Sequence, residues 1–282
     1  GDPWTAAKQA GPNLHYFHLP GESILKRVNL AMQKVVTPFC AWLGDDEFQL
    51  PSGLACSADI LASNTSVVAA IGSCVGFNMT KNGITGGSVY GYTSKEFSCR
   101  LAQRIEDFFL HYSPTMAYAL WRSERLKEAT RLATYMEWGS GNLWEWIQAF
   151  CGLCQGNHVI HSQVQWLRSD ENPPQQAQLK RSVEICQWWR EPRFENERYQ
   201  LILQLDQFLK ATVPCDEHFA STLIKGAFEF TLFGDSQSKN LQLLGLKPAK
   251  NYNRSYSQSL AKALRSARPT PPSEKEIAEI MQ

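Results

Sequence analysis

The sequence predicts an α+β fold that is predominantly α-helical, with a small antiparallel sheet. Apolar residues recur at helical spacing through most of the chain, and the strongest strand signal is a hairpin near residues 66–92. The chain has 282 residues, of which 43% are hydrophobic and 20% charged, so it can bury a substantial core. We expect no membrane span, because no apolar run reaches the roughly 18 residues that a spanning helix needs.

The first elements are a helix and the hairpin. The helix begins at Ser23 and ends before Pro38, because its apolar residues fall on one side at a spacing of three to four. Strands are expected at 66–77 and 84–92, since both segments are rich in Val, Ile and small residues. Asn82–Gly83 between them is typical of a two-residue hairpin turn.

Helices are predicted for most of the remaining chain. Thr93 and Glu96 have the spacing of a capping box, which predicts a helix over 93–112. Ser113–Pro114 has the pattern of an N-cap followed by an N1 proline and predicts a helix to about residue 138. Further helices are expected at 57–62, 143–153, 178–189, 194–210 and 216–225, and a strand at 227–233.

A polar segment at 168–176 contains adjacent prolines and is the best internal linker candidate. It predicts an N-terminal α+β domain over 1–168 and a C-terminal helical region with a basic tail over 177–282. One continuous domain is the alternative, since a chain of this length fits either arrangement.

The charges of the chain are segregated. No acidic residue lies between Asp235 and Glu274, whereas seven basic residues do. The whole chain has 28 basic and 27 acidic residues, so removal of these seven leaves 21 against 27. Such segregation indicates a partner with acidic groups. The candidate binding residues are Lys239, Lys247, Lys250, Tyr252, Arg254, Tyr256, Lys262, Arg265 and Arg268.

Three partners are compatible with this basic segment. Basic side chains that neutralise phosphates, interleaved with tyrosines that stack on bases, favour nucleic acid. An acidic protein in a larger assembly and the acidic body of the chain itself are the alternatives. The leading hypothesis is a non-enzymatic binding or assembly subunit.

Residues 151–161 hold the tightest group of metal-ligating side chains: Cys151, Cys154, His158 and His161. Cys and His are the ligands that zinc prefers. On an unbroken helix these four positions span about 15 Å and cannot share one ion, so a zinc site requires a break at Gly156–Asn157. The alternative is a turn with buried cysteines and ordinary histidines. No other cofactor is expected.

No strong catalytic motif is present, and no catalytic residue is assigned. The runner-up to a binding protein is a cysteine-dependent hydrolase or transferase that uses Cys74, which lies among small residues, with a histidine as its base. His158, His161 and His218 are the available bases. A solvated loop is expected for Asp45–Glu47, and core packing for most of the tryptophans.

The eight cysteines permit four disulfides, and three N-x-S/T sequons occur, at Asn64, Asn78 and Asn253. Most of the cysteines lie in apolar or helical contexts, where a free thiol behaves as a small hydrophobe. We therefore expect reduced cysteines and a cytoplasmic protein, and a secreted or periplasmic location stays open.

Overall fold

The computed structural model describes residues 14–44, 46–81, 83–90, 95–97, 100–109, 114–169, 183–215 and 217–233. Its helices are α2 (Ile24–Lys34), α3 (Pro51–Ser63), α4 (Leu101–Phe109), α5 (Ser123–Ala133), α6 (Leu143–Gln155), α7 (Ile185–Arg190), α8 (Glu195–Thr212) and α9 (Glu217–Phe233). Its strands are β1 (Phe39–Cys40), β2 (Glu47–Gln49), β3 (Val67–Thr80), β4 (Gly83–Tyr90), β5 (Lys95–Glu96), β6 (Leu120–Arg122) and β7 (Asn157–Ser169). Short 3-10 turns lie at Pro114–Met116 and Pro192–Phe194.

The described strands form one mixed sheet of seven, so the predicted predominantly α-helical fold with a small antiparallel sheet is wrong, and the described part has mixed α/β content. Its centre is a parallel pair of long strands, β3 and β7. The outer edge of β3 pairs with β6 near Ala69 and with β4 beyond Cys74, both antiparallel. The outer edge of β7 pairs with β5 and β2, also antiparallel, and β1 extends the sheet from β6.

The sequence prediction missed β7 because its alternation is irregular. Its buried positions do not follow a strict period of two, since β3 and β7 carry register shifts between Val67 and Cys74. Gly156 separates α6 from β7 and lies against Ser66, the residue that precedes β3. A Cβ at Gly156 would lie 2.6 Å from the Ser66 carbonyl oxygen, so glycine is needed for this close approach.

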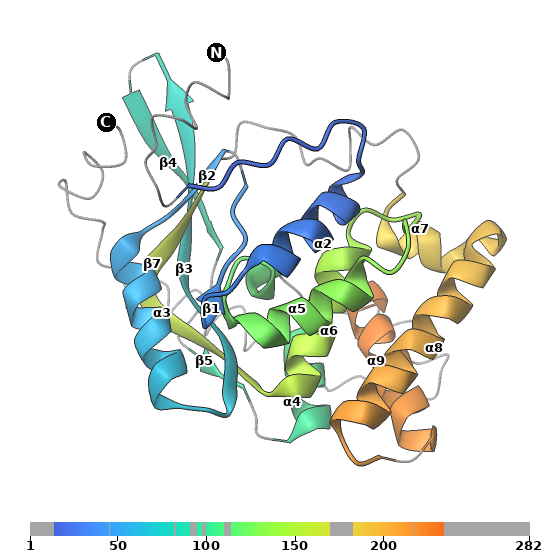
Figure 1. Cartoon of the computed structure of the whole chain (residues 1–282). Helices are drawn as coiled ribbons and strands as arrows, with labels where there is room; N and C mark the ends of the chain where they lie inside the picture. The colour runs from blue at the N-terminus through green and yellow to red at the C-terminus, as the bar shows by residue number, and fades with distance from the viewer. Residues whose placement is uncertain are drawn as a thin grey trace.

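Helices cover both faces of the sheet unequally (Figure 1). Of the described helices, only α3 lies on one face, over a small core formed by Leu61, Val67, Ala70 and Leu120. Helices α4, α5 and α6 pack on the opposite face, and α8 and α9 pack outside them. The large core between the sheet and these helices includes Trp121, Trp146 and Trp188, each fully buried.

Several predicted elements are confirmed. The predicted N-terminal helix forms as α2, and the Ser23 side chain accepts a hydrogen bond from the Lys26 amide at 3.3 Å. The predicted helices over 143–153 and 194–210 form as α6 and α8. The hairpin forms as β3 and β4, although Thr80 pairs with Gly83, which places the connection one residue earlier than predicted.

Three predicted elements are wrong. Glu96 lies in β5, so the predicted helix does not begin at Thr93 and forms only from Leu101. The predicted helix over 113–138 is interrupted by β6. The predicted strand over 227–233 is the last part of α9, because this segment continues a helix that packs on α4 and α8.

The predicted linker lies mostly outside the described residues, and the division at 168–177 stays a prediction. Helices α7, α8 and α9 nevertheless share their core with the N-terminal half. The rings of Trp146 on α6 and Phe228 on α9 are stacked, with centroids 3.9 Å apart. Within the described residues, no helix has the length and apolar character needed to cross a membrane.

Candidate functional site

All nine candidate binding residues of the basic segment lie outside the described residues. The last of these described residues is Phe233, the C-terminal residue of α9. Their binding role therefore stays a prediction based on sequence.

The four predicted zinc ligands divide between a helix and a strand. Cys151 and Cys154 lie on α6, whereas His158 and His161 lie on β7. The chain breaks at Gly156, as a zinc site would require. However, no three His, Cys, Asp or Glu side chains gather as a metal-binding group within the described part of the chain.

The two cysteines are deeply buried in the large core. Burial raises the pKa of the Cys151 thiol well above its usual range, and the neighbouring Cys154 adds to the effect. Burial also raises the pKa of Cys154, although the Arg104 guanidinium opposes this. Protonated thiols are poor metal ligands and poor nucleophiles. The zinc site stays a prediction.

His158 lies on the face of the sheet that carries α4, α5 and α6, which is called the helix-bearing face and is opposite to α3. Its Nδ1 lies 3.2 Å from the Ala69 carbonyl oxygen, which can only accept, so Nδ1 carries the proton. The rings of Phe97 and Phe108 lie 5.6 and 6.3 Å from the imidazole. Burial lowers the pKa of His158 to about 3, so its imidazole is neutral at physiological pH.

His161 belongs to a polar network beneath α3. The Ser57 hydroxyl donates to the Gln165 side-chain oxygen at 2.5 Å, and this oxygen also accepts from the Gly72 amide at 3.0 Å. The Ser57 hydroxyl proton is thus engaged by Gln165, so Ser57 Oγ can only accept from His161 Nε2, which lies 2.8 Å away. The imidazole Nε2 therefore carries a proton and donates it in this hydrogen bond. His161 therefore does not act as a base toward Ser57, which is itself fully buried. This network joins α3 to β7.

Cys74, the candidate nucleophile, is fully buried on the helix-bearing face, in the large core. His161 contacts α3 on the opposite face. His158 pairs with Ala69, five residues before Cys74 on β3, which corresponds to about 16 Å along the strand. His218 lies on α9. The cysteine-dependent hydrolase therefore stays a prediction, and neither of the two strand histidines is positioned to activate the thiol.

The structure places the Tyr118 phenol within electrostatic range of Cys74 and of the carboxyl groups of Glu145, Glu47 and Asp46. The Tyr118 ring stacks on Trp166 with centroids 4.0 Å apart, and the Gln49 amide nitrogen donates to the Tyr118 carbonyl at 3.1 Å. Glu47 on β2 and Glu145 in the first turn of α6 lie within electrostatic range of the Tyr118 hydroxyl.

Burial is the main cause of the raised pKa values in this Glu47–Glu145–Tyr118 cluster. It raises the pKa of Glu145 to about 7, and the negative charge of Glu47 adds to the shift. Burial also raises the pKa of Glu47, although hydrogen bonds from the Gly44 amide and the Trp166 side chain oppose it. A carboxyl group that is half ionised near pH 7 can donate or accept a proton.

Sequence reasoning missed this cluster. Glu47 was expected in a solvated loop but lies half-buried in β2. No role was predicted for Glu145, which lies between Trp144 and Trp146. A signal was present, because a glutamate flanked by Trp144 and Trp146 near the start of an apolar helix must face a largely apolar surface.

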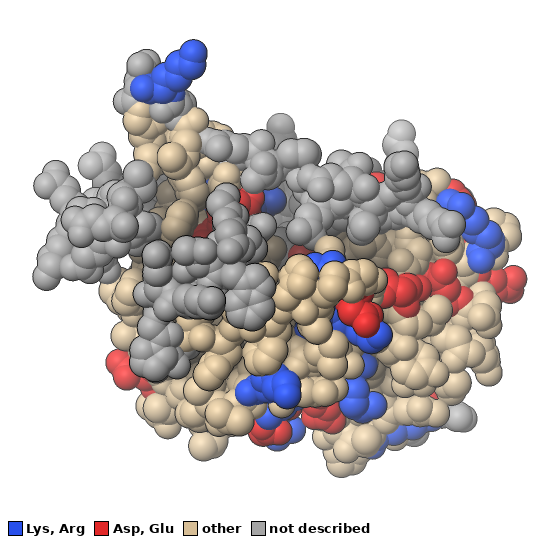
Figure 2. All heavy atoms as spheres, turned by 45° about the horizontal axis from the view of Figure 1, so that its top comes forward, with Lys and Arg blue, Asp and Glu red and all other residues tan. Residues whose placement is uncertain are grey.

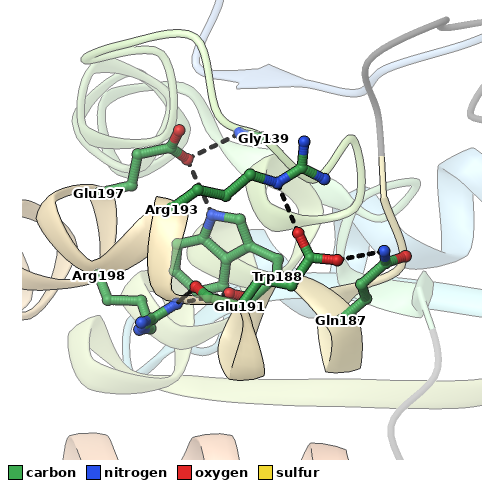
Figure 3. Close-up of polar contacts among 7 residues, drawn as sticks. All are labelled: Gly139, Gln187, Trp188, Glu191, Arg193, Glu197 and Arg198. Carbon is green, nitrogen blue, oxygen red and sulfur yellow. Dashed lines mark hydrogen bonds and ion pairs between the residues drawn. The ribbon is translucent and has the colours of Figure 1, made fainter.

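The adjacent tryptophans Trp188 and Trp189 lie on α7, and Trp188 has a structural role in the described part of the chain (Figure 3). Trp188 is fully buried, and its indole N–H donates to Glu197 at 2.8 Å. The same carboxylate oxygen accepts from the Gly139 amide at 2.8 Å. Arg198 donates to the carbonyl oxygens of Trp188 and Glu191 at 2.7 and 2.8 Å, so α7 is fixed to α8.

No protein-family model matches the chain, and the search of curated proteins finds no match.

Proposed function

We propose that the protein is a binding or assembly subunit that contacts nucleic acid through its basic C-terminal segment, residues 236–273. The observation that carries the proposal is the charge segregation, with seven basic and no acidic residues between Asp235 and Glu274. Each phosphate that a Lys or Arg neutralises releases condensed counterions, which makes such binding favourable at low salt.

The basic side chains of the described residues are arranged differently from those of the basic segment, and this difference supports the proposal. The Arg104 guanidinium donates to the Leu153 carbonyl and to Asn157, and Arg122 donates to the carbonyl oxygens of Val67 and Asn64. These two cations are engaged inside the fold. On the face shown in Figure 2, basic and acidic side chains are interspersed. The basic segment, by contrast, carries seven basic and no acidic residues.

Tyr252 and Tyr256 add stacking surfaces between the cations Lys250, Arg254 and Lys262. Stacking of a base on an aromatic ring contributes about 1–3 kcal/mol and requires unpaired bases. The tyrosines therefore favour single-stranded regions, whereas the cations contact the backbone of any nucleic acid.

The test is salt-dependent binding of the full chain to fluorescent single-stranded and duplex oligonucleotides. Contacts to five to seven phosphates predict that log K falls with log salt at a slope of very roughly −4 to −6. Replacement of the seven basic residues by Gln should abolish binding at low salt. The control replaces the exposed body residues Lys26, Lys34 and Arg125 by Gln and should keep most of the affinity.

Two results would contradict the proposal: no binding of the unmodified protein at low ionic strength, or equal affinity of the seven-residue variant. Salt-dependent binding to poly-glutamate without binding to nucleic acid would assign the segment to an acidic protein partner.

A cytoplasmic location is part of the proposal, and the six free cysteines among the described residues are consistent with it.

A further inference from the structure

The β3–β4 ribbon extends beyond the rest of the sheet. The last residue of β3 that pairs with β7 is Phe77, opposite Ser169. The following pairs, from Asn78 with Thr85 to Thr80 with Gly83, join β3 to β4 alone. Three residues at about 3.3 Å each extend the ribbon by about 10 Å past this point. Figure 1 shows this hairpin projecting from the body.

The projecting part exposes apolar side chains in matched positions. Met79 and Ile84 are direct cross-strand partners and are 55% and 47% exposed. Lys81, at the turn, is exposed as well. Two large apolar side chains beside one cation form a surface that suits a partner with negative charge on its outside and apolar groups further in.

Within segment 60–95, which contains the ribbon, the charged residues have one sign. No Asp or Glu occurs between Asp59 and Glu96, whereas Lys81 and Lys95 lie in this segment. At the end of the projection, Figure 2 shows basic and uncharged atoms. An approaching polyanion therefore meets no carboxylate of the ribbon itself.

We infer that the β3–β4 ribbon enters the major groove of duplex DNA, with Lys81 toward the phosphates and Met79 and Ile84 against the base edges. The major groove admits a two-stranded ribbon and is about 12 Å wide and about 8.5 Å deep, which matches the projection of about 10 Å. Apolar side chains contact the thymine methyl group there. The inference rests on the proposed nucleic-acid function and adds duplex DNA as the target of the ribbon.

The experiment compares the full chain with a Met79→Ser/Ile84→Ser double variant and with Lys81→Ala. Binding to a duplex should weaken about tenfold or more in the double variant, because two apolar contacts are lost, while the salt slope stays the same. Lys81→Ala should lower the magnitude of the slope by about 1. Dimethyl sulfate protection of guanine N7, which lies in the major groove, should be present with the unmodified protein and lost with the double variant.

Tyr199→Ser, at a residue of α8 that is 63% exposed, is the matched control and should keep the duplex affinity within about twofold. Unchanged thermal unfolding of all variants excludes misfolding. If the unmodified protein binds no nucleic acid, both proposals fail. If it binds through the basic segment but the ribbon variants keep full affinity and N7 protection, only the ribbon inference fails. Sedimentation that shows a dimer dissolved by Met79→Ser/Ile84→Ser, with duplex binding intact, would make the ribbon a contact between two copies.

Discussion

At the scale of single residues, His158 shows how the fold holds a titratable group in its neutral form. Its Nδ1–H is used by the Ala69 carbonyl, and Nε2 has no hydrogen-bond partner within the described residues. Protonation of Nε2 would place a charge between the rings of Phe97 and Phe108 without a compensating group. The pKa of His158 is therefore lowered to about 3 by burial.

This lowered pKa predicts a loss of stability in acid. The unfolded state, with a His pKa of about 6.5, binds more protons than the folded state between pH 6.5 and pH 3. The free energy of unfolding therefore falls as the pH falls through this window. From pH 7.5 to pH 4.5 we expect the protein to lose about 3 kcal/mol more than His158→Gln, which cannot titrate. Urea unfolding at both pH values measures the difference.

The control for this prediction is Gln33→Ala, because Gln33 is exposed and cannot titrate. It should show the same pH dependence as the unmodified protein. Equal acid sensitivity of His158→Gln and the unmodified protein would contradict the assignment of a buried neutral imidazole.

At the scale of elements, helix α3 is held on the sheet by close backbone approach. Gly53, Ser57 and Leu61 form its buried face at a spacing of four. A Cβ at Gly53 would lie 2.5 Å from both the Gln165 Cα and the Val164 carbonyl oxygen. This approach brings Ser57 within reach of His161 and Gln165, so the glycine positions the polar network.

We therefore expect Gly53→Ala to destabilise the protein, although alanine is the better helix former by about 1 kcal/mol. The added methyl group meets backbone atoms, which cannot move aside as a side chain can, and a cost of about 1–3 kcal/mol is typical of such overpacking. Chemical denaturation measures the change. Gly86→Ala is the matched control, because a Cβ at Gly86 meets nothing within 4 Å, and it should change stability little. A stabilised Gly53→Ala variant would contradict the close packing.

The elements also show how far the sequence could predict the fold. Local signals were sufficient for α2, where Ser23 caps the helix, and for α6 and α8, where apolar residues recur at helical spacing. They failed for β6, a strand of three residues defined by its pairing with Phe39–Cys40 and Ala69–Ala70. Such pairing joins residues far apart in sequence, and no local pattern encodes it.

The candidate sites follow the same rule. Charge segregation in residues 236–273 is visible in the sequence because it needs only counting. The sequence around Glu145 contained a signal, but its grouping with Glu47 and Tyr118 was not predictable, because the three residues come from α6, β2 and the turn before β6. The Cys151–His161 spacing was visible, but the side-chain directions depend on α6 ending at Gln155 and β7 beginning at Asn157.

At the scale of the whole molecule, the described parts of the N-terminal and C-terminal regions share one core, and this predicts a single cooperative unfolding transition. Phe228 on α9 stacks on Trp146 of α6, so the C-terminal helices cannot separate without exposing the centre of the core. Phe228→Ala should cost about 3–5 kcal/mol, whereas Phe219→Ala, on the same helix at a site 38% exposed, should cost far less. Guanidinium unfolding followed by tryptophan fluorescence and by far-UV circular dichroism should give coincident curves for each variant. Two separate transitions, with Phe228→Ala shifting only one, would instead establish 1–168 and 177–282 as independent domains.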